Sequence, residues 1–306
     1  MKTISIVSPV YNEEGNIRVF YNSLSSVVKD IKQNYEIIFV NDGSLDGSPI
    51  ILEEIAREDK HIKVIHFSRN FGHQSAITAG LDFASGDAVV IIDSDMQDPP
   101  SIIVDLIKKW ENGYDVVNAH RRTRKDSNIK AITAKIFYKV LNFLITNKIP
   151  ENVGDFRLLD RSVVDVLKKL PEKDRYLRGL SCWVGFKQGI VDFDRDKRYS
   201  GTTHYSLNKM FTLAFDAIFS FSKLPIKMAL FSSFLFFLVA TFVLIYAVIS
   251  WALGYTVVGW ASILFIFSTL SSIQMLVLAI ISEYVGRIYT QAQGRPLYVV
   301  MDTINF

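Results

Sequence analysis

The chain has 306 residues, of which 49% are hydrophobic, and 34 Lys and Arg side chains stand against 31 Asp and Glu, for a net charge of +3. This apolar fraction and low net charge exclude a disordered chain, because enough surface can be buried to offset the entropy lost on folding. The single cysteine, Cys182, excludes a disulfide framework and any cysteine-cluster metal site. The nearly balanced charge also argues against a dedicated nucleic-acid binder, which usually has a pronounced basic excess.

Short runs rich in Ile and Val alternate with helical patterns in the first part of the chain. The runs predict strands at 4–7, 35–40, 63–67, 88–92 and 115–118. Apolar residues three and four apart predict helices at 16–31, 48–57, 74–84 and 100–110. This alternation implies an α/β fold with a mostly parallel sheet, in which ligands bind beyond the carboxyl ends of the strands.

Polar segments follow four of these strands. They are Pro9-Val-Tyr-Asn-Glu13, Asn41-Asp-Gly-Ser-Leu-Asp46, Ser68-Arg-Asn-Phe-Gly-His-Gln74 and Asp93-Ser-Asp-Met-Gln-Asp-Pro-Pro100. Asp93 and Asp95 can offer carboxylate oxygens to one hard divalent cation, Mg²⁺ or Mn²⁺, which substrate phosphates would share. We therefore expect a nucleotide diphosphate as a partner. The alternative is a solvated turn or a helix N-cap, because Asp98-Pro-Pro also suits the start of a helix.

Two segments between the α/β region and the C-terminal region predict amphipathic helices. Residues 129–147 carry apolar side chains at helical spacing, with lysines on the other faces. Residues 206–227 are rich in Phe and Leu and lead into a long apolar run. We expect both helices to lie along a membrane surface. The alternative is packing against the soluble domain or against another copy of the chain.

The C-terminal region predicts two membrane spans. Residues 228–282 contain no Asp, Glu, Lys or Arg, whereas one spanning helix needs only about 20 apolar residues. The glycines and aromatic residues from Trp251 to Trp260 divide the run, so we expect the two-helix hairpin at 228–283 to consist of helices at about 228–250 and 261–283.

Charges flanking the hairpin indicate its orientation. Lys223 and Lys227 precede the first helix, and Arg287 and Arg295 follow the second, so the positive-inside rule places both termini in the cytoplasm. The N-terminal residues lack the apolar core of a signal peptide. We therefore expect a cytosolic domain at residues 1–205 and a cytosolic tail at 284–306.

Five motifs, in order along the chain, carry a resemblance to a known family. They are Pro9-Val-Tyr-Asn-Glu-Glu14, Val40-Asn-Asp-Gly-Ser44, Arg69-Asn-Phe-Gly72, Asp93-Ser-Asp-Met-Gln-Asp98 and Gly154-Asp-Phe-Arg-Leu158. The set resembles the polyisoprenyl-phosphate glycosyltransferases of glycosyltransferase family 2, which include the dolichol-phosphate mannosyltransferases and the bactoprenol glucosyltransferases. The resemblance extends through 199–205 and the paired apolar helices. It implies a Rossmann-like GT-A domain and inverting chemistry.

The resemblance assigns residues to the nucleoside pocket. Pro9, Tyr11, Glu13 and Asp42 would line it. A carboxylate such as that of Asp42 can accept the ring N–H of uracil or guanine, and Tyr11 can lie against the base. The alternative for Asp42 is an ordinary turn in which its side chain bonds the local backbone.

The resemblance also assigns the reacting centre. Asp93 and Asp95 would hold Mg²⁺ or Mn²⁺, which neutralises charge on the leaving diphosphate, and Gln97 would orient this cluster or the sugar. Asp155 matches the acceptor-side carboxylate of the family. Because a lipid monophosphate already carries about −1.5 to −2 charge at neutral pH, Asp155 is expected to position more than to deprotonate. Its alternative role is a helix cap or an ion pair with Arg157.

Cations are needed to bring an anionic acceptor beside an anionic donor. Arg121, Arg122 and Arg198 are the expected phosphate ligands, with Lys209 as a weaker candidate, because guanidinium groups match phosphate oxygens. The alternative is attraction to anionic lipid headgroups. For Arg124, binding of the substrate phosphate and attraction to headgroups are equally favoured.

Three further residues receive weaker interpretations. His204 stands where many relatives have Lys, so a phosphate role for it is open. His73 and Cys182 are interpreted as structural, because neither has sequence neighbours typical of a metal site or a nucleophile pair.

The resemblance thus implies a membrane-anchored hexosyltransferase that uses a nucleotide sugar, with UDP-glucose favoured, and a polyprenyl phosphate acceptor such as undecaprenyl phosphate. It would act at the cytosolic face of the plasma membrane. The alternatives are the same chemistry with GDP-mannose or a UDP-amino-arabinose donor, and a non-catalytic scaffold or flipping partner for lipid-linked sugars. We expect the lipid bilayer and a second copy of the chain as partners, and no nucleic acid.

Overall fold

The computed structural model describes residues 2–122, 153–173, 175–194, 224–254 and 259–306. Two compact units make up the chain. One contains Met1–Met210 together with Pro296–Phe306, and the other contains Phe211–Arg295. The amphipathic helix expected at 129–147 lies outside the described residues, as does all but the end of the one expected at 206–227.

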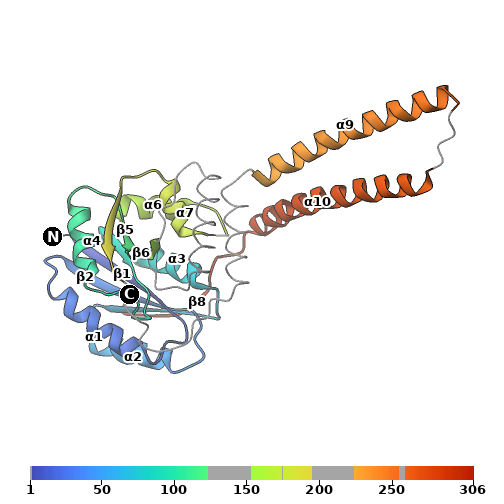
Figure 1. The fold of residues 1–306 in the computed structure, drawn as a ribbon. Helices are drawn as coiled ribbons and strands as arrows, with labels where there is room; N and C mark the ends of the chain where they lie inside the picture. Colours follow the sequence, from blue (N-terminus) through green and yellow to red (C-terminus); the bar gives the residue numbers. More distant parts are fainter. Residues whose placement is uncertain (1, 123–152, 174, 195–223, 255–258) are drawn as a thin grey trace. The chain divides into compact units, whose positions relative to one another are not determined.

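An eight-stranded sheet forms the centre of the first unit, with the strand order β7-β5-β6-β4-β1-β2-β3-β8 (Figure 1). The strands are β1 (Thr3–Val10), β2 (Asn34–Asn41), β3 (Ile62–Phe67), β4 (Ala88–Ile91), β5 (Val116–Arg121), β6 (Val153–Asp160), β7 (Gln188–Phe193) and β8 (Val300–Ile304). Strands β1 to β4 run parallel, as do β5 and β7, whereas β6 is antiparallel to β4 and β5, and β8 to β3. The predicted α/β fold with a mostly parallel sheet is confirmed.

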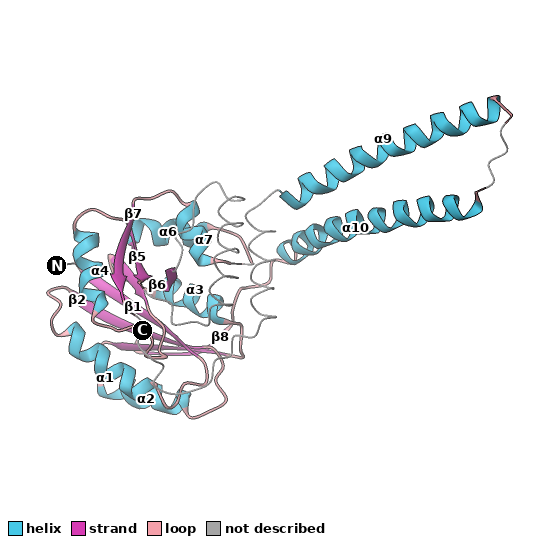
Figure 2. Cartoon of the chain, in the orientation of Figure 1, coloured by secondary structure: helices cyan, strands magenta, loops and turns pink. Residues whose placement is uncertain are grey.

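Helices cover both faces of this sheet (Figure 2). They are α1 (Ile17–Val28), α2 (Ser48–Glu58), α3 (His73–Phe83), α4 (Ile102–Glu111), α6 (Arg161–Lys169) and α7 (Leu177–Trp183). Helices α1, α2 and α4 pack on strand residues such as Ile6. The next residue, Val7, points to the opposite face, where α3 approaches so closely that a Cβ on Gly80 would lie 2.1 Å from Val7 Cγ1. Burial on both faces explains why these strands are continuously apolar.

The C-terminal residues differ from the expected tail. Helix α10 continues to Ala292, and residues 300–304 form β8 beside β3. Without β8, the outer edge of β3 would present unpaired backbone N–H and C=O groups. The segment that follows the apolar helices is therefore part of the sheet of the first unit.

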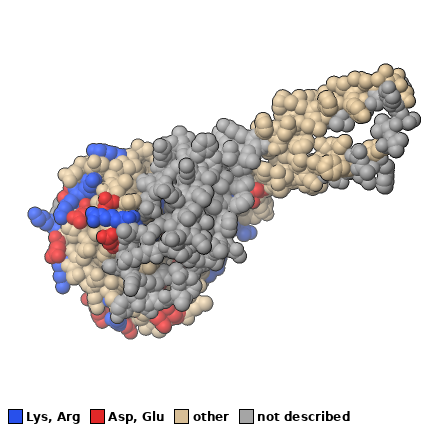
Figure 3. All heavy atoms as spheres, viewed as in Figure 1, with Lys and Arg blue, Asp and Glu red and all other residues tan. Residues whose placement is uncertain are grey.

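The second unit contains the helices α9 (Leu224–Ala252) and α10 (Trp260–Ala292), which lie on either side of the expected turn. Figure 3 shows that their visible surface carries almost no charged side chains. In the part of the chain that the structure describes, one stretch, Phe265–Ala292, is long and apolar enough to cross a membrane, and an 18-residue window within it has a mean hydropathy of 2.0. Helix α9 contains a shorter apolar stretch, Ala229–Val239. A second span therefore stays a prediction.

Candidate active site

The loops that follow β1 and β2 are tied together by side chains. The Asn12 N–H donates to Ser44 Oγ (3.0 Å), and the Leu45 N–H donates to Asn12 Oδ1 (2.8 Å). Asn12 adopts a left-handed backbone conformation with φ of 54°. These bonds fix the segment that carries Tyr11, which is exposed, and Glu13, which is half-buried. An exposed ring on a fixed loop suits the predicted contact with a base.

Asp42 holds the loop after β3. Its side chain is buried, with Oδ1 accepting from the Phe71 N–H (2.7 Å) and Oδ2 from the Gly72 N–H (3.0 Å). Burial raises the pKa of Asp42, and these two bonds oppose the rise only in part. The neighbouring Gly43 has φ of 65°, and a Cβ there would lie 2.4 Å from the backbone carbon of Arg69. Asp42 thus joins two loops of the site, and its contact with a base stays a prediction.

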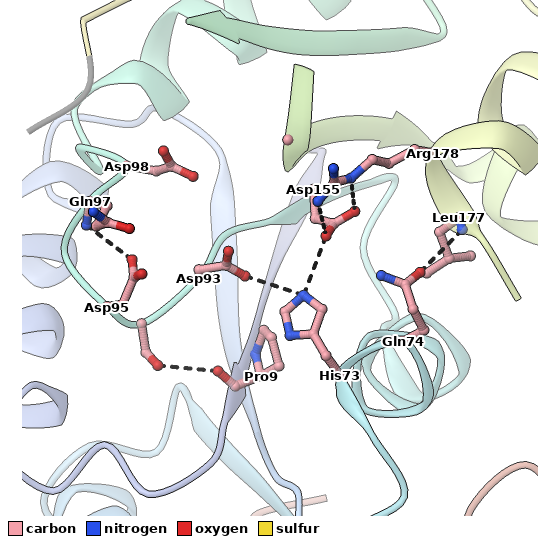
Figure 4. Close-up of polar contacts among 12 residues, drawn as sticks. Pro9, His73, Gln74, Asp93, Asp95, Gln97, Asp98, Asp155, Leu177 and Arg178 are labelled. Carbon is pink, nitrogen blue, oxygen red and sulfur yellow. Dashed lines mark hydrogen bonds and ion pairs between the residues drawn. The ribbon is translucent and has the colours of Figure 1, made fainter. Parts of the chain in front are cut away.

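Asp93 and Asp95 lie in the loop after β4 (Figure 4). Burial, with help from neighbouring carboxylates, raises the pKa of Asp93 to about 6 against the opposing effect of a nearby imidazole. Asp95 is buried and accepts the Gln97 N–H (3.1 Å). The hydroxyl of Ser94, between them, donates to the backbone oxygen of Pro9 (3.2 Å), which holds this loop against the end of β1.

The two carboxylates fit a hard divalent cation. Asp93 Oδ1 is buried and has no hydrogen-bond partner among the described residues. The His73 imidazole is its ionic neighbour, with Nε2 3.6 Å away, so the oxygen still has lone pairs to offer a metal cation. No group of three or more His, Cys, Asp or Glu side chains in the described ranges could hold a metal. Mg²⁺ typically takes one or two carboxylates and completes its shell with water and substrate phosphates, so this donor set suits a cation that binds together with a diphosphate.

His73, the first residue of α3, lies between two carboxylates (Figure 4). Its Nε2 is 3.6 Å from Asp93 Oδ1 and 3.4 Å from Asp155 Oδ2. Desolvation lowers the pKa of His73, but the two carboxylates outweigh it and raise this pKa to about 9. The side chain is 44% exposed. His73 is thus a cation that remains open to a ligand.

Asp155 is bound on its other side by Arg178 of α7. Arg178 Nε donates to Oδ1 (2.9 Å) and the terminal nitrogen donates to Oδ2 (2.8 Å). Burial by itself raises the pKa of Asp155, but Arg178 and His73 hold it well below its usual range. Asp155 is therefore an ionised carboxylate at neutral pH. Arg157, the alternative partner expected from the sequence, donates instead to the Gly154 carbonyl oxygen (2.7 Å) and to a serine hydroxyl.

His73 was interpreted as structural for want of suitable neighbours, but the structure places it beside the carboxylates of Asp93 and Asp155. Its neighbours come from the end of β4 and from β6, which are distant in sequence but adjacent in the sheet. The sequence signal that could have found it is Gly72, a glycine between a polar loop and the predicted helix. In the structure Gly72 has φ of 98° and caps α3, whose first residue is His73. Arg178 was missed because no motif marks α7. Cys182 is buried, which agrees with a structural interpretation, and burial raises the pKa of its thiol.

The predicted phosphate ligands occupy different surroundings. Arg121 donates to both oxygens of Asp98 (3.3 and 3.2 Å), and Asp98 is almost fully buried. This pair gives Arg121 a structural role that the sequence did not predict. Arg122 is exposed. Arg124, Arg198, His204 and Lys209 lie outside the described residues.

Comparisons with known proteins identify the family. The family described as glycosyl transferase family 2 matches residues 5–167. The chain is 47% identical over 304 residues to an uncharacterized glycosyltransferase, YkcC, of Bacillus subtilis, covering 97% of this chain and 92% of the relative. It is 39% identical over 303 residues to the bactoprenol glucosyl transferase of Shigella phage SfV, covering 97% of each.

Among solved structures, a glucosyl-3-phosphoglycerate synthase from Mycobacterium tuberculosis, in complex with Mn²⁺ and UDP-glucose, is 21% identical with a TM-score of 0.46, covering 70% of this chain and 75% of that one. The match of the family over more than half of the chain, together with relatives of this identity along nearly its whole length, decides the assignment. The protein is a glycosyltransferase and belongs to glycosyl transferase family 2.

Proposed function

We propose that the protein transfers a hexose from a nucleotide sugar to a polyprenyl phosphate, with UDP-glucose as the donor and inversion at the anomeric carbon. The observation that carries this proposal is the ionised Asp155 held between two cations beside Asp93. The similarity to a bactoprenol glucosyl transferase over nearly the whole chain supports the acceptor class and the glucosyl group.

On the donor side, the loops after β1 and β4 would hold the nucleotide diphosphate. Pro9, Tyr11 and Glu13 would surround the nucleoside, and Asp93 and Asp95 would bind Mg²⁺ or Mn²⁺. A cation there would neutralise the charge that builds on the leaving diphosphate. The buried Asp93 Oδ1 supports this assignment, because it accepts no hydrogen bond from the described residues and has only the His73 imidazole, at 3.6 Å, as an ionic neighbour.

On the acceptor side, the surroundings of Asp155 favour an acceptor that is already an anion. A carboxylate whose pKa lies far below neutrality is a poor general base. A lipid phosphate needs no base, because its oxygen is already charged. His73 and Arg178, whose side chains are 44% and 25% exposed, would attract that anion, while Asp155 fixes the orientation of both.

The proposed reaction is one in-line displacement. An oxygen of the lipid phosphate forms a bond to the anomeric carbon as the bond from that carbon to the nucleotide diphosphate breaks, and the nucleotide diphosphate leaves with the electron pair. A single displacement of this kind inverts the configuration and requires no covalent sugar–enzyme intermediate. The charges in this site serve to bring two anions together and to stabilise the leaving group.

We also propose that α9 and α10 form a transmembrane hairpin with both termini in the cytoplasm. The apolar stretch Phe265–Ala292 and the exposed apolar side chains of α9 support this arrangement. The acceptor phosphate lies at the bilayer surface, so tethering would raise its effective concentration at the site. The expected homo-oligomer stays a prediction, which light scattering in detergent would measure.

The test is transfer of radiolabelled sugar to undecaprenyl phosphate in detergent, with UDP-glucose, GDP-mannose and UDP-amino-arabinose compared. We expect Mg²⁺- or Mn²⁺-dependent label in the lipid fraction from UDP-glucose, and NMR of the product should show inversion. Asp95→Asn should abolish most transfer, whereas Asp105→Asn, an exposed aspartate on α4, should not. If lipid is labelled only with GDP-mannose, the donor is GDP-mannose and not UDP-glucose. Absence of both transfer and nucleotide binding would refute the proposal and favour a scaffold.

A further inference from the structure

The last eleven residues, Pro296–Phe306, which we name the C-terminal strap, bind the edge of the sheet next to the site. Strand β8 pairs antiparallel with β3, and the register shifts where β3 ends, between His66 and Phe67. Just beyond β3, the Ser68 N–H donates to the backbone oxygen of Val299 (3.0 Å). The strap therefore contacts the backbone at the point where the loop Ser68–Gly72 begins.

Aromatic contacts continue from the strap into that loop. The ring of Tyr298 stacks on Phe67, with centroids 5.0 Å apart and an interplanar angle of 11°. Phe67 is in turn in edge contact with Phe71 at 5.7 Å, and the Arg69 guanidinium lies 4.0 Å from the centre of the Phe71 ring. The Phe71 N–H is one of the two donors to Asp42. A continuous set of contacts thus runs from Tyr298 to the loop that precedes His73.

The strap also contacts the far end of helix α3. The Tyr298 hydroxyl donates to Asp82 Oδ2 (2.8 Å), and the ring of Phe306 is in edge contact with Phe83 at 5.2 Å. Both partners lie in the last turn of α3, which begins at His73. The strap therefore binds both β3 and α3, the two elements between which the loop Ser68–Gly72 is suspended.

We propose that the C-terminal strap positions the loop Ser68–Gly72 and His73, and that Tyr298 is a positioning residue for the donor site. Only Gln293, Gly294 and Arg295 separate the end of α10 from the strap. The chain that leaves the apolar helix therefore enters the sheet within a few residues and contacts the end of β3, where the loop Ser68–Gly72 begins, through Tyr298. This inference rests on the proposed function for its catalytic consequence, but the contacts themselves belong to the fold.

The experiment uses the full chain in detergent and compares Tyr298→Ala, Tyr298→Phe and Met301→Ala. Met301 lies in the same strap but is 69% exposed, so it is the matched control. Hydrogen–deuterium exchange of peptides from 68–83 reports the loop and α3, with a peptide from β2 as internal reference. UDP binding in the presence of Mn²⁺, measured by calorimetry, and the donor KM and kcat report the site.

For Tyr298→Ala, which loses both the stack and the hydroxyl bond, we expect exchange in 68–72 to rise about tenfold. We expect UDP to bind several-fold more weakly and the donor KM to rise more than kcat falls, while the β2 peptide stays protected. Tyr298→Phe keeps the stack and should recover most of the binding. Met301→Ala should match the unmodified protein.

Unchanged exchange in 68–83 and unchanged UDP affinity in Tyr298→Ala would overturn the proposal, as would an equal effect from Met301→Ala. If Tyr298→Ala does not fold, Tyr298→Phe and Asp82→Ala each remove the hydroxyl bond while keeping the stack, and both must still raise exchange in 68–72 measurably. The exchange measurement needs no substrate. Suppose that the unmodified protein glycosylates no polyprenyl phosphate, but Tyr298→Ala still raises exchange in 68–72. This result would refute the proposed function and support the positioning role of the strap.

Discussion

Replacing Arg178 by leucine tests the central ion pair of the site. The change removes both hydrogen bonds to Asp155, whose side chain is only 6% exposed. Removing one partner of a buried ion pair costs about 3–5 kcal/mol, because the remaining charge stays buried without compensation. Since Arg178 is 25% exposed and His73 still contacts the carboxylate, we expect the lower limit, about 3 kcal/mol.

That loss can be measured as a thermal shift. For a domain of roughly 150–250 residues, 1 kcal/mol corresponds to about 2–4 °C in Tm, so Arg178→Leu should lower Tm by about 6–12 °C. Unfolding in detergent can be followed by the fluorescence of Trp110, which is buried in the first unit. The matched control is Arg57→Leu, because Arg57 is 74% exposed and its ion pair with Glu53 is at the surface. We expect the control to change stability by less than about 0.5 kcal/mol.

A double-mutant cycle separates the pair from other effects of the substitution. Asn at position 155 carries no charge, so Asp155→Asn combined with Arg178→Leu should be less destabilised than the two single variants summed, by about 2 kcal/mol. A coupling below about 0.5 kcal/mol, or equal shifts from Arg178→Leu and Arg57→Leu, would show that Arg178 does not compensate Asp155. Asp155 would then not be held in its ionised form by Arg178.

The other predictions concern charge and backbone. Arg121→Ala should lower Tm by several degrees, because it removes the ion pair between Arg121 and the buried carboxylate of Asp98. Arg122→Ala should keep Tm and raise the KM for lipid acceptor in transfer assays. Burial raises the pKa of Glu36, but hydrogen bonds from a lysine and two serines lower it below 4.5. Its stabilisation is therefore present above that pH and lost as the pH falls toward the folded-state pKa, so Glu36→Gln should flatten the fall in Tm below about pH 5. Gly43→Ala should lower Tm and weaken nucleotide binding, because φ is 65° and a Cβ would lie 2.4 Å from the β3 loop backbone.

The strands and helices of the first 120 or so residues could be predicted because periodicity and burial coincide there. Strands β1 to β5 and helices α1 to α4 lie within a few residues of their expected positions. Strand β6 could not be predicted in this way, because Asp155 and Arg157 interrupt its apolar pattern. Asp155 is buried beside the guanidinium of Arg178, and Arg157 is buried with hydrogen bonds to the Gly154 carbonyl oxygen and the Ser181 hydroxyl.

The site was predictable where chemistry is local in sequence. Asp93 and Asp95 stand at a strand end, and the fold places them where the parallel sheet requires. The contacts of His73, Arg121 and Arg178 were not predictable, because each has its partner on another element. Periodicity identifies an element, but it does not say which elements become neighbours in the sheet.

The direction of β6 explains how those contacts arise. In the antiparallel pair of β4 and β6, Ala88 lies opposite Asp160 and Ile91 lies opposite Arg157. Continuing this register by two residues brings Asp93 opposite Asp155, at the carboxyl end of β4. Because β6 is antiparallel, its first residues, including Asp155, lie at this edge; a parallel strand would place its last residues here. A shift of the register by one residue would turn Asp155 to the other face of the sheet. Two carboxylates in opposed positions repel each other unless cations lie beside them, so the register that assembles the site also requires His73 and Arg178 beside it.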